Sequence, residues 1–548
     1  MPDSHCFRGR WRSCHFFLCR IAHPDGQECL KRIAATEWKY GLEKRCAERD
    51  DLVASYFPSG FQEPETGTTG EQRNAVKTKP FFPDQLAFGC TVFIFQENHA
   101  VKPESAQKSP RKNTMCILFC RRSMSKWRFL SALQKNFPQW QGDDFLLWSP
   151  SMFQHVEAYP GDPILSLNEA FGKDTRPGKI NVSIGIYFDD NGKIPMLPSV
   201  RAAEHKVVND AGARPYLPME GAANFRSAVQ QLLFGADSAA VKEGRVVTMQ
   251  TVGSSGGLKI GGDFIKRYFP QSVMLVSDPT WDNHRAVFEG CGMTVKTYPY
   301  YDSATGGLKF EAMLEALKAA DKHSIVLLHA CCHNPTGVDL SKEQWQALVP
   351  VIKERELIPF MDLAYQGYGD GIDEDAFAIR LFAEQGLSFF VANSFSKSMS
   401  LYGERCGALS VVCPDAAQAV NVLGQMKATI RRNYSNPPIH GGQLVAQVLS
   451  DATLRPMWEA EVKEMRERIQ LMRRKLHDVL SAKVPGRDFS YFLTQRGMFS
   501  YTGLSAEQCD RLREEFGLYL VRSGRMCIAG LNSGNVEAAA NAIAAVLK

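Results

Sequence analysis

The most constraining feature of this sequence is an ordered alternation of apolar strands and amphipathic helices that runs from residue 152 to residue 548. Such an alternation argues for an α/β fold in which a mainly parallel sheet carries helices on both faces. The strand candidates are residues 246–249, 273–276, 324–328, 358–361 and 389–392. The helix candidates are residues 258–268, 310–320, 342–354 and 458–480, of which the last leads into a smaller C-terminal subdomain.

The first 151 residues have a different character. They mix isolated aromatic residues, cysteines, arginines and polar clusters, and no helical or strand period persists for long. Residues 102–113 are polar and charged and contain two prolines, which is typical of a linker or a disordered segment. We therefore expect residues 1–151 to form a poorly ordered N-terminal extension and residues 152–548 to form the folded unit.

Composition excludes several classes of protein. A formal net charge of +5 over 548 residues gives no reason to expect a nucleic acid or a membrane surface as partner. No run of eighteen apolar residues and no secretory signal is found, so we expect a cytoplasmic protein. The fifteen cysteines are scattered as reduced thiols would be. The adjacent Cys331 and Cys332, with His333, are a poor tetrahedral site, so we expect no metal.

Lys397 is the first candidate for chemistry. It lies in Ser394-Phe395-Ser396-Lys397-Ser398, directly after a predicted strand, and the ends of such strands are where open α/β sheets place their binding sites. Most lysines are solvated surface charges. A lysine that forms a Schiff base instead needs partial desolvation, which lowers its pKa and frees the amine as a nucleophile.

Asp362 and Tyr365 follow another apolar strand. A carboxylate in this position is costly to bury unless a cation or a hydrogen-bond donor meets it. A helix N-cap or a structural salt bridge explains such an aspartate about as well as a functional role does. A protonated pyridine nitrogen would be a suitable partner for the carboxylate, and a phenolate oxygen would suit the tyrosine.

Three further features are each only weak evidence for a binding site. The segment Gly253-Ser254-Ser255-Gly256-Gly257 joins a strand to a helix, where free N–H groups can meet an anion, although it matches no nucleotide-binding motif. Asn334 lies in an Asn-Pro-Thr-Gly turn that can also be ordinary loop chemistry. Arg431 and Arg525 could bind carboxylates bidentately, but most arginines are surface residues.

Together these elements resemble the class I aminotransferases, in the subgroup of aspartate and aromatic amino-acid aminotransferases. The resemblance covers essentially residues 152–548 and rests on five motifs in the order typical of the family. They are Asp278-Pro279-Thr280-Trp281-Asp282-Asn283-His284, Cys331-Cys332-His333-Asn334-Pro335-Thr336-Gly337, Asp362-Leu363-Ala364-Tyr365-Gln366-Gly367, Ser394-Phe395-Ser396-Lys397 and Asn433-Tyr434-Ser435-Asn436-Pro437-Pro438.

The resemblance implies a fold and a cofactor. The fold is the fold type I transferase dependent on pyridoxal 5′-phosphate (PLP), with a seven-stranded sheet in a large domain of about residues 195–460. A smaller α/β domain is formed by the N-terminal arm and about residues 461–548. Lys397 would bind PLP as a Schiff base and move a proton between the substrate Cα and C4′ of the cofactor.

The other implied cofactor contacts surround the ring and the phosphate. Asp362, supported by His284, would keep the pyridine nitrogen protonated. Asn334 and Tyr365 would hydrogen-bond the ring hydroxyl, and Trp281 would stack on the ring. The phosphate would be held by Ser254, Ser255, Ser394, Ser396 and Arg405, together with Tyr216 from a second subunit.

For the substrate, Arg525 would bind the α-carboxylate, with help from Gly185 and Asn334, and Trp281 would line the same site. Arg431, from the second subunit of a homodimer, would bind a side-chain carboxylate. Apolar residues at Ile186, Tyr187, Phe188 and Ile194, and serine at Ser255, favour an aromatic side chain.

We therefore expect transfer of the amino group of tyrosine or phenylalanine, and also of aspartate, to 2-oxoglutarate. The main alternative is an aspartate aminotransferase with aspartate as the main donor. A lyase on the same fold, a catalytically dead relative and a non-enzymatic PLP-binding regulator are more remote. Met152 resembles the native start of a bacterial member of the family, so residues 1–151 are expected to come from an over-long gene prediction, with a genuine targeting or regulatory extension as the alternative.

Overall fold

The computed structural model describes residues 153–159, 161–210 and 212–548 with their side chains, and before them the backbone of four strands. The chain divides into two compact units, Met1–Glu157 and Ala158–Lys548. In the first unit, β1 (His5–Trp11), β2 (Cys14–Ile21), β4 (Thr114–Cys120) and β3 (Cys90–Gln96) pair antiparallel in that order. These strands were not predicted. Each has seven or eight residues, and none of the four segments alternates strictly between apolar and polar residues.

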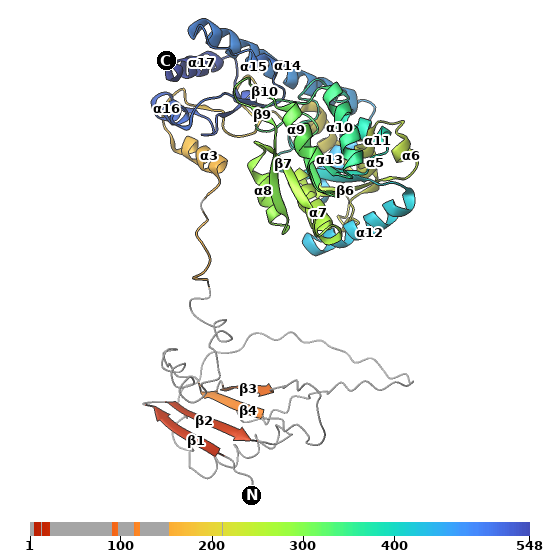
Figure 1. Ribbon diagram of the computed structural model, residues 1–548, viewed down its shortest axis with the longest axis vertical. Helices are drawn as coiled ribbons and strands as arrows, with labels where there is room; N and C mark the ends of the chain where they lie inside the picture. The colour runs from red at the N-terminus through yellow and green to blue at the C-terminus, as the bar shows by residue number, and fades with distance from the viewer. Residues whose placement is uncertain are drawn as a thin grey trace. The chain divides into compact units, whose positions relative to one another are not determined.

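A seven-stranded sheet forms the centre of the second unit (Figure 1). Its order is β6 (Val246–Val252), β14 (Cys406–Val412), β13 (Phe389–Ser394), β12 (Ile358–Leu363), β11 (Ile325–His329), β7 (Val273–Asp278) and β8 (Thr294–Pro299). β14 runs antiparallel to both its neighbours, and the other six strands share one direction. The predicted mainly parallel seven-stranded sheet is therefore confirmed.

Both faces of this sheet are buried. Along β11, Ile325 and Leu327 belong to one hydrophobic cluster, whereas Val326 and Leu328 belong to the other. One face packs on α7 (Gly253–Tyr268), α8 (Asp282–Glu289) and α12 (Ala416–Asn433). The opposite cluster includes residues of α5 (Ala223–Phe234), α9 (Phe310–Lys318), α10 (Lys342–Glu354), α11 (Phe377–Glu384) and α13 (Ile439–Ser450). Burial on both faces explains why the central strands are continuous apolar runs.

Two strands escaped detection in the sequence. β8 lies at the edge of the sheet and exposes most of its residues, so no apolar run marks it. β14 is fully buried, but Gly407, Ala408 and Ser410 interrupt its run of large apolar residues, so no continuous apolar segment marks it in the sequence. The five strands that were predicted all form, and each begins within one residue of its predicted start and ends one to three residues beyond its predicted end.

The predicted start of α7 is wrong. The segment 253–257 was interpreted as a turn before a helix at residue 258, but the helix begins at Gly253. The glycines permit close packing rather than a turn: a Cβ on Gly261 would lie 2.6 Å from the ring of Phe360, and one on Gly257 would lie 3.3 Å from Cβ of Ala392. Tertiary packing thus overrides the local preference of glycine.

Two short strand pairs form outside the central sheet, and one of them joins the N-terminal to the C-terminal part of this unit. β5 (Ile180–Asn181) lies parallel to β16 (Leu518–Tyr519), and β15 (Phe499–Tyr501) lies antiparallel to β17 (Arg525–Cys527). The long helix α14 (Leu454–Lys483) leads into this region and includes the predicted helix 458–480. The remaining elements are α3 (Pro163–Lys173), α4 (Pro198–Asn209), α6 (Ala239–Lys242), β9 (Tyr301–Asp302), β10 (Gly307–Leu308), η2 (Glu374–Ala376), α15 (Tyr491–Thr494), α16 (Ala506–Phe516), η3 (Ile528–Gly530) and α17 (Val536–Leu547).

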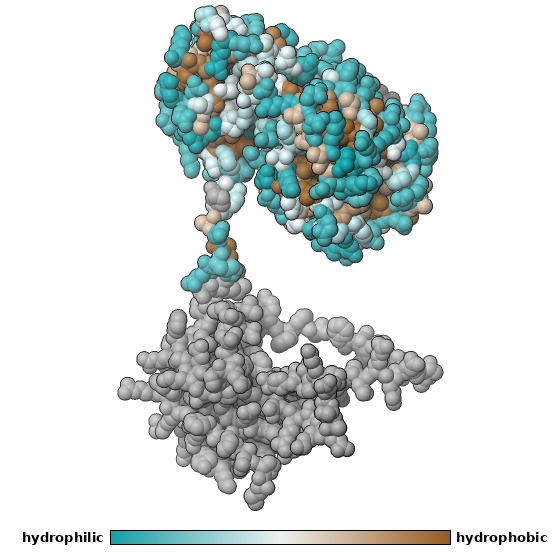
Figure 2. Space-filling model, in the orientation of Figure 1, coloured by the Kyte–Doolittle hydropathy of each residue, from teal (hydrophilic) through white to brown (hydrophobic). Residues whose placement is uncertain are grey.

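On the face shown in Figure 2, hydrophobic residues of the second unit lie scattered among hydrophilic ones. Among the described residues, no helix combines the length and the apolarity needed to cross a bilayer.

Because a Cβ at Gly261 would overlap Phe360 in the core, the Gly261→Ala variant should lose about 1–3 kcal/mol of unfolding free energy, the usual cost of overpacking. Gly172 in α3 is the matched control, since a Cβ there meets nothing within 4 Å and alanine should be neutral or slightly stabilising. Urea denaturation of the two variants checks the difference, and equal stabilities would contradict the packing argument.

Candidate active site

The functional side chains gather where the parallel strands end. Asp362 is the penultimate residue of β12, Ser394 is the last residue of β13, and Ser254 directly follows β6 at the start of α7. Asn334 follows β11 and Trp281 follows β7. The carboxyl ends of parallel strands meet at one edge of a sheet, which is where open α/β sheets form their binding crevice.

A cavity of about 170 Å³ lies at this edge. Ten of its twelve lining residues were predicted from the sequence, and His329 and Ala364 were not. The ten are Ser254, Ser255, Trp281, Asn334, Asp362, Tyr365, Ser394, Ser396, Lys397 and Arg405. Residues from four of the five motifs are therefore brought into one cavity with Ser254, Ser255 and Arg405.

Lys397 is held by its backbone on both sides. The hydroxyl of Tyr368 donates a hydrogen bond to the Lys397 carbonyl at 3.0 Å, and Trp458 Nε1 donates to the Ser398 carbonyl at 2.7 Å. Lys397 Nζ lies 5.0 Å from the centre of the Tyr365 ring. Burial lowers the pKa of Lys397 to about 8 although the charge of Asp362 acts in the opposite direction, so the amine loses its proton far more easily than that of an ordinary lysine.

Asp362 is buried with one oxygen paired and one free. Its Oδ2 lies 3.0 Å from Nε2 of His284, and its Oδ1 has no hydrogen-bond partner. Because an ionised carboxylate can only accept, His284 Nε2 donates, and Nδ1 can accept from the Thr280 hydroxyl at 2.8 Å. Burial alone would raise the pKa of Asp362. The hydrogen bond and charge of His284 outweigh this effect, so that the pKa of Asp362 lies below its usual value. The free oxygen is thus an ionised acceptor in the cavity wall.

His329 is a site residue that the sequence analysis missed. Neither of its ring nitrogens has a partner, and its ring lies 5.2 Å from that of His284 and 4.3 Å from that of His333. Burial lowers its pKa to about 3, so it stays neutral. Its position directly after the predicted strand 324–328 is the signal that could have identified it, and the structure places it opposite Asp362 in the register.

Two sets of potential metal ligands occur among the described residues. One is His284, His329 and Asp362, and the other is Cys331, Cys332 and Asp375. In the first set, Asp362 already accepts from His284, and in the second, burial raises the pKa of Cys332 to about 12, which keeps that thiol protonated. A protonated thiol is a poor ligand because metals bind the thiolate.

One end of the cavity presents groups that can bind an anion. Ser254 and Ser255 lie in the first turn of α7, where backbone N–H groups have no partner within the helix. Arg405 Nη1 donates to Ser396 Oγ at 3.2 Å. A Cβ on Gly253 would lie only 2.5 Å from Arg405 Nη2, so glycine is required for the guanidinium to reach this position.

Arg525 forms a second cationic point close to the cavity. Its Nη1 donates to Asn334 Oδ1 at 3.3 Å, its Nη2 donates to the Ser183 carbonyl at 2.8 Å, and its Nε has no partner. The guanidinium lies 4.5 Å over the ring of Phe499, and a Cβ on Gly185 would lie 2.9 Å from the same ring. Among the described residues no carboxylate pairs with Arg525, although it is only 5% exposed.

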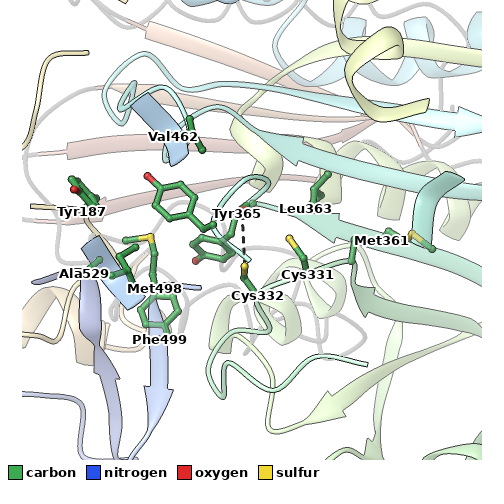
Figure 3. Packing of buried hydrophobic residues seen from close by; sticks show 14 of the residues in the cluster. Tyr187, Cys331, Cys332, Met361, Leu363, Tyr365, Val462, Met498, Phe499 and Ala529 are labelled. Atoms are coloured by element: carbon green, nitrogen blue, oxygen red, sulfur yellow. Dashed lines mark hydrogen bonds between the residues drawn. The ribbon is translucent and has the colours of Figure 1, made fainter. Parts of the chain in front are cut away.

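Figure 3 shows the packing behind this part of the site. The ring of Tyr365 meets that of Phe499 edge to face at 5.8 Å, and the thiol of Cys332 donates to the Tyr365 carbonyl at 3.8 Å. Burial raises the pKa of Tyr365, while the charge of Arg525 acts in the opposite direction. The tyrosine is therefore a neutral hydroxyl that the C-terminal region helps to position.

Several predicted residues lie outside the cavity. His284 lies behind Asp362, and Gly185 packs on Phe499. Tyr216 is 91% exposed, and Arg431 is exposed and donates to Ser435. These last two residues were expected to act across a dimer, so their roles stay predictions.

The proposed apolar wall is likewise not part of the cavity lining. Tyr187 is buried with its hydroxyl accepting from Arg468 at 2.7 Å, whereas Ile194 is 47% exposed. Ile186 and Phe188 are partly buried. Their influence on substrate choice stays a prediction.

Comparisons with known proteins agree with this geometry. The family model described as aminotransferase class I and II matches residues 177–543. The aromatic-amino-acid aminotransferase of Escherichia coli K12 is 58% identical over 397 residues, which cover 72% of this chain and 100% of the relative. An aspartate aminotransferase of Pseudomonas aeruginosa is 53% identical over the same coverage.

A solved structure of the aromatic-amino-acid aminotransferase from Burkholderia pseudomallei, covalently bound to pyridoxal phosphate, is 54% identical with a TM-score of 0.72. It covers 73% of this chain and 100% of its own. The chain therefore belongs to the class I and II aminotransferases, in the subgroup of the aromatic-amino-acid and aspartate aminotransferases, and is a PLP-dependent enzyme.

Proposed function

We propose that the protein is an aromatic amino-acid aminotransferase, which transfers the amino group of tyrosine or phenylalanine, and also of aspartate, to 2-oxoglutarate. The observation that carries this proposal is the pairing of Lys397, whose pKa is about 8, with the unpartnered Oδ1 of Asp362 in one cavity. A reactive amine and a buried carboxylate acceptor are what PLP requires of a protein.

The cavity fits PLP at both ends. Asp362 Oδ1 is an acceptor for a protonated pyridine nitrogen, and His284 keeps the carboxylate ionised. Asn334 and Tyr365 would hydrogen-bond the ring hydroxyl, and Trp281 would stack on the face of the ring. The start of α7, with Ser254 and Ser255, and the group of Ser394, Ser396 and Arg405 hold the phosphate. When bound, PLP supplies an aldehyde that links to an amine and a ring that withdraws electrons from the substrate Cα.

Lys397 acts as both nucleophile and base. Its lowered pKa would free Nζ to bond the cofactor, and once the amino group of the substrate displaces Nζ from that bond, the released amine would take the proton from the substrate Cα. Tyr368 and Trp458 fix the backbone on either side of it, which limits where Nζ can reach.

Arg525 binds the α-carboxylate of the substrate. Its Nε lacks a partner and no acid neutralises it among the described residues, so a bound carboxylate supplies the missing partner. Asn334, already bonded to Nη1, keeps the guanidinium oriented toward the cavity, and Gly185 leaves room for the Phe499 ring below it.

The active form is a homodimer with shared sites. Tyr216, 91% exposed here, would reach the cofactor phosphate of the partner, and Arg431 would bind a side-chain carboxylate there. Phe153, Val156 and Tyr159 are also large, exposed and apolar, which is typical of a segment that docks on another subunit. Cytoplasmic localisation is part of the same proposal.

The catalytic unit is residues 152–548. The 397 residues aligned with the Escherichia coli enzyme equal the length of that segment. Within it, a large domain of about residues 195–460 carries the cofactor. The pairing of β5 with β16 supports a smaller domain built from the N-terminal arm and about residues 461–548.

Aspartate as the main donor is the second candidate, favoured by the 53% identity to the Pseudomonas aeruginosa aspartate aminotransferase. The purified protein, assayed with 2-oxoglutarate, should use tyrosine and phenylalanine with a kcat/KM equal to or above that for aspartate. The Lys397→Ala variant should lose activity with every donor, since it lacks the nucleophile and base. A wild-type protein that used aspartate alone would establish the second candidate instead.

The pH dependence of cofactor attachment tests the lysine. Its amine is protonated below its pKa, so the rate at which cofactor-free protein binds PLP covalently should rise about tenfold per pH unit and level off above about pH 8. Visible absorbance of the bound cofactor reports the rate. A rate that keeps rising to pH 10 would show an unperturbed lysine and contradict the assignment.

The carboxylate site is tested by Arg525→Gln. Removing one partner of a buried charge pair costs about 2–5 kcal/mol, so kcat/KM for every amino acid should fall by at least about thirtyfold. Arg522, three residues away, is 61% exposed at its side chain and pairs with Asp510, so Arg522→Gln is the matched control and should keep wild-type kinetics. Equal kinetics of the two variants would remove Arg525 from the substrate site.

A further inference from the structure

A second cavity, of about 220 Å³, lies between α14 and residues 493–497. It shares no lining residue with the candidate active site. Three arginines, Arg473, Arg474 and Arg496, and two glutamines, Gln470 and Gln495, line it. None of these five side chains has a part in the function proposed above.

The positive charge around this cavity is only partly neutralised. Arg496 pairs with Asp370 at 2.9 Å, but no carboxylate of the described residues pairs with Arg473 or Arg474. Arg473 is 3% exposed, and its hydrogen bonds go to neutral acceptors: the carbonyls of Gly497 at 2.8 Å and Phe499 at 2.6 Å, with others, and Ser500 Oγ. A buried cation without an anion is unfavourable, and burial lowers the pKa of Arg473 to about 10.

Gln495 gives an independent indication of a ligand. It is 2% exposed, and neither its amide oxygen nor its amide nitrogen has a hydrogen-bond partner. Buried polar groups are almost always paired, because each unpaired one costs about 1–3 kcal/mol. The unpaired amide N–H group, in the wall of a cavity that also presents guanidinium groups, is explained by a bound molecule with acceptor oxygens.

We propose that this cavity is a second anion site, which takes a small dianion such as phosphate or a short dicarboxylate. Arg473 and Arg474 supply the two positive charges that have no internal partner, and Gln495 supplies an N–H donor. The site is reached over the exposed side chain of Arg474, whereas Arg473 and Gln495 form its buried floor.

Calorimetric titration of the holoenzyme tests the proposal, with inorganic phosphate and succinate as probes in separate runs. The holoenzyme is used because bound PLP already occupies the cofactor phosphate site, so that the probe cannot bind there. Arg474→Gln removes one exposed charge and should weaken the binding of the dianion at least about tenfold. Arg511, on α16 and paired with Glu515 at 2.7 Å, is the matched control, so Arg511→Gln should bind as the wild type does.

A second variant, Gln495→Glu, keeps the size of the side chain but places an acid in the cavity wall, and it should abolish binding. Binding that is lost in Arg474→Gln supports the proposal: if only phosphate binds in this way, the site takes an oxyanion, and if only succinate does, it takes a dicarboxylate. Equal binding by the wild type and Arg474→Gln would place the probe at the substrate arginines and overturn it. Absence of binding to the wild type in the millimolar range would overturn it as well.

Discussion

The whole site depends on a parallel sheet that is buried on both faces. Because β6, β7, β11, β12 and β13 run in one direction, their carboxyl ends deliver side chains from distant parts of the chain to one edge. The two hydrophobic clusters pack on opposite faces of the sheet and fix the register of each strand relative to its neighbours. The register that places His329 opposite Asp362, and Asp362 opposite Ala392, therefore also fixes the geometry of the cavity.

Within that frame, burial sets the chemistry of the site. Removal from water lowers the pKa of Lys397 and frees its amine, whereas His284 offsets the same effect at Asp362 and keeps that group ionised. A lysine amine that loses its proton more easily than usual and an anionic acceptor thus coexist in one small cavity. The neutral His329 lies beside them without adding a charge, because burial keeps its pKa near 3.

The C-terminal region contributes to the site through packing as much as through charge. β15 presents Phe499 to both Tyr365 and the guanidinium of Arg525. β17 begins with Arg525, and Arg473 on α14 binds the carbonyls of residues 497 and 499. Through these hydrogen bonds Arg473 holds the segment that runs from Gly497, in the wall of the second cavity, to Phe499, whose ring lies under Arg525.

The sequence by itself determined the fold class and most of the site. The apolar runs before Asp362 and Ser394, the Asn-Pro turn, the glycine-serine segment and the roles implied by the family resemblance together identified ten of the twelve residues that line the cavity. Short motifs of this kind are local in sequence, so they can be recognised before the fold is known. The family assignment followed from their order, and the relatives confirm it.

Only the tertiary structure decided the features that depend on contacts between distant residues. The start of α7 at Gly253, the free oxygen of Asp362 and the place of His329 in the cavity follow from packing and pairing across strands. β8 and β14 were missed because one is an exposed edge and the other is rich in small residues. The second cavity, lined by Arg473, Arg474 and Arg496, is formed by residues more than twenty positions apart in the chain, and no local sequence pattern predicts that they lie close together.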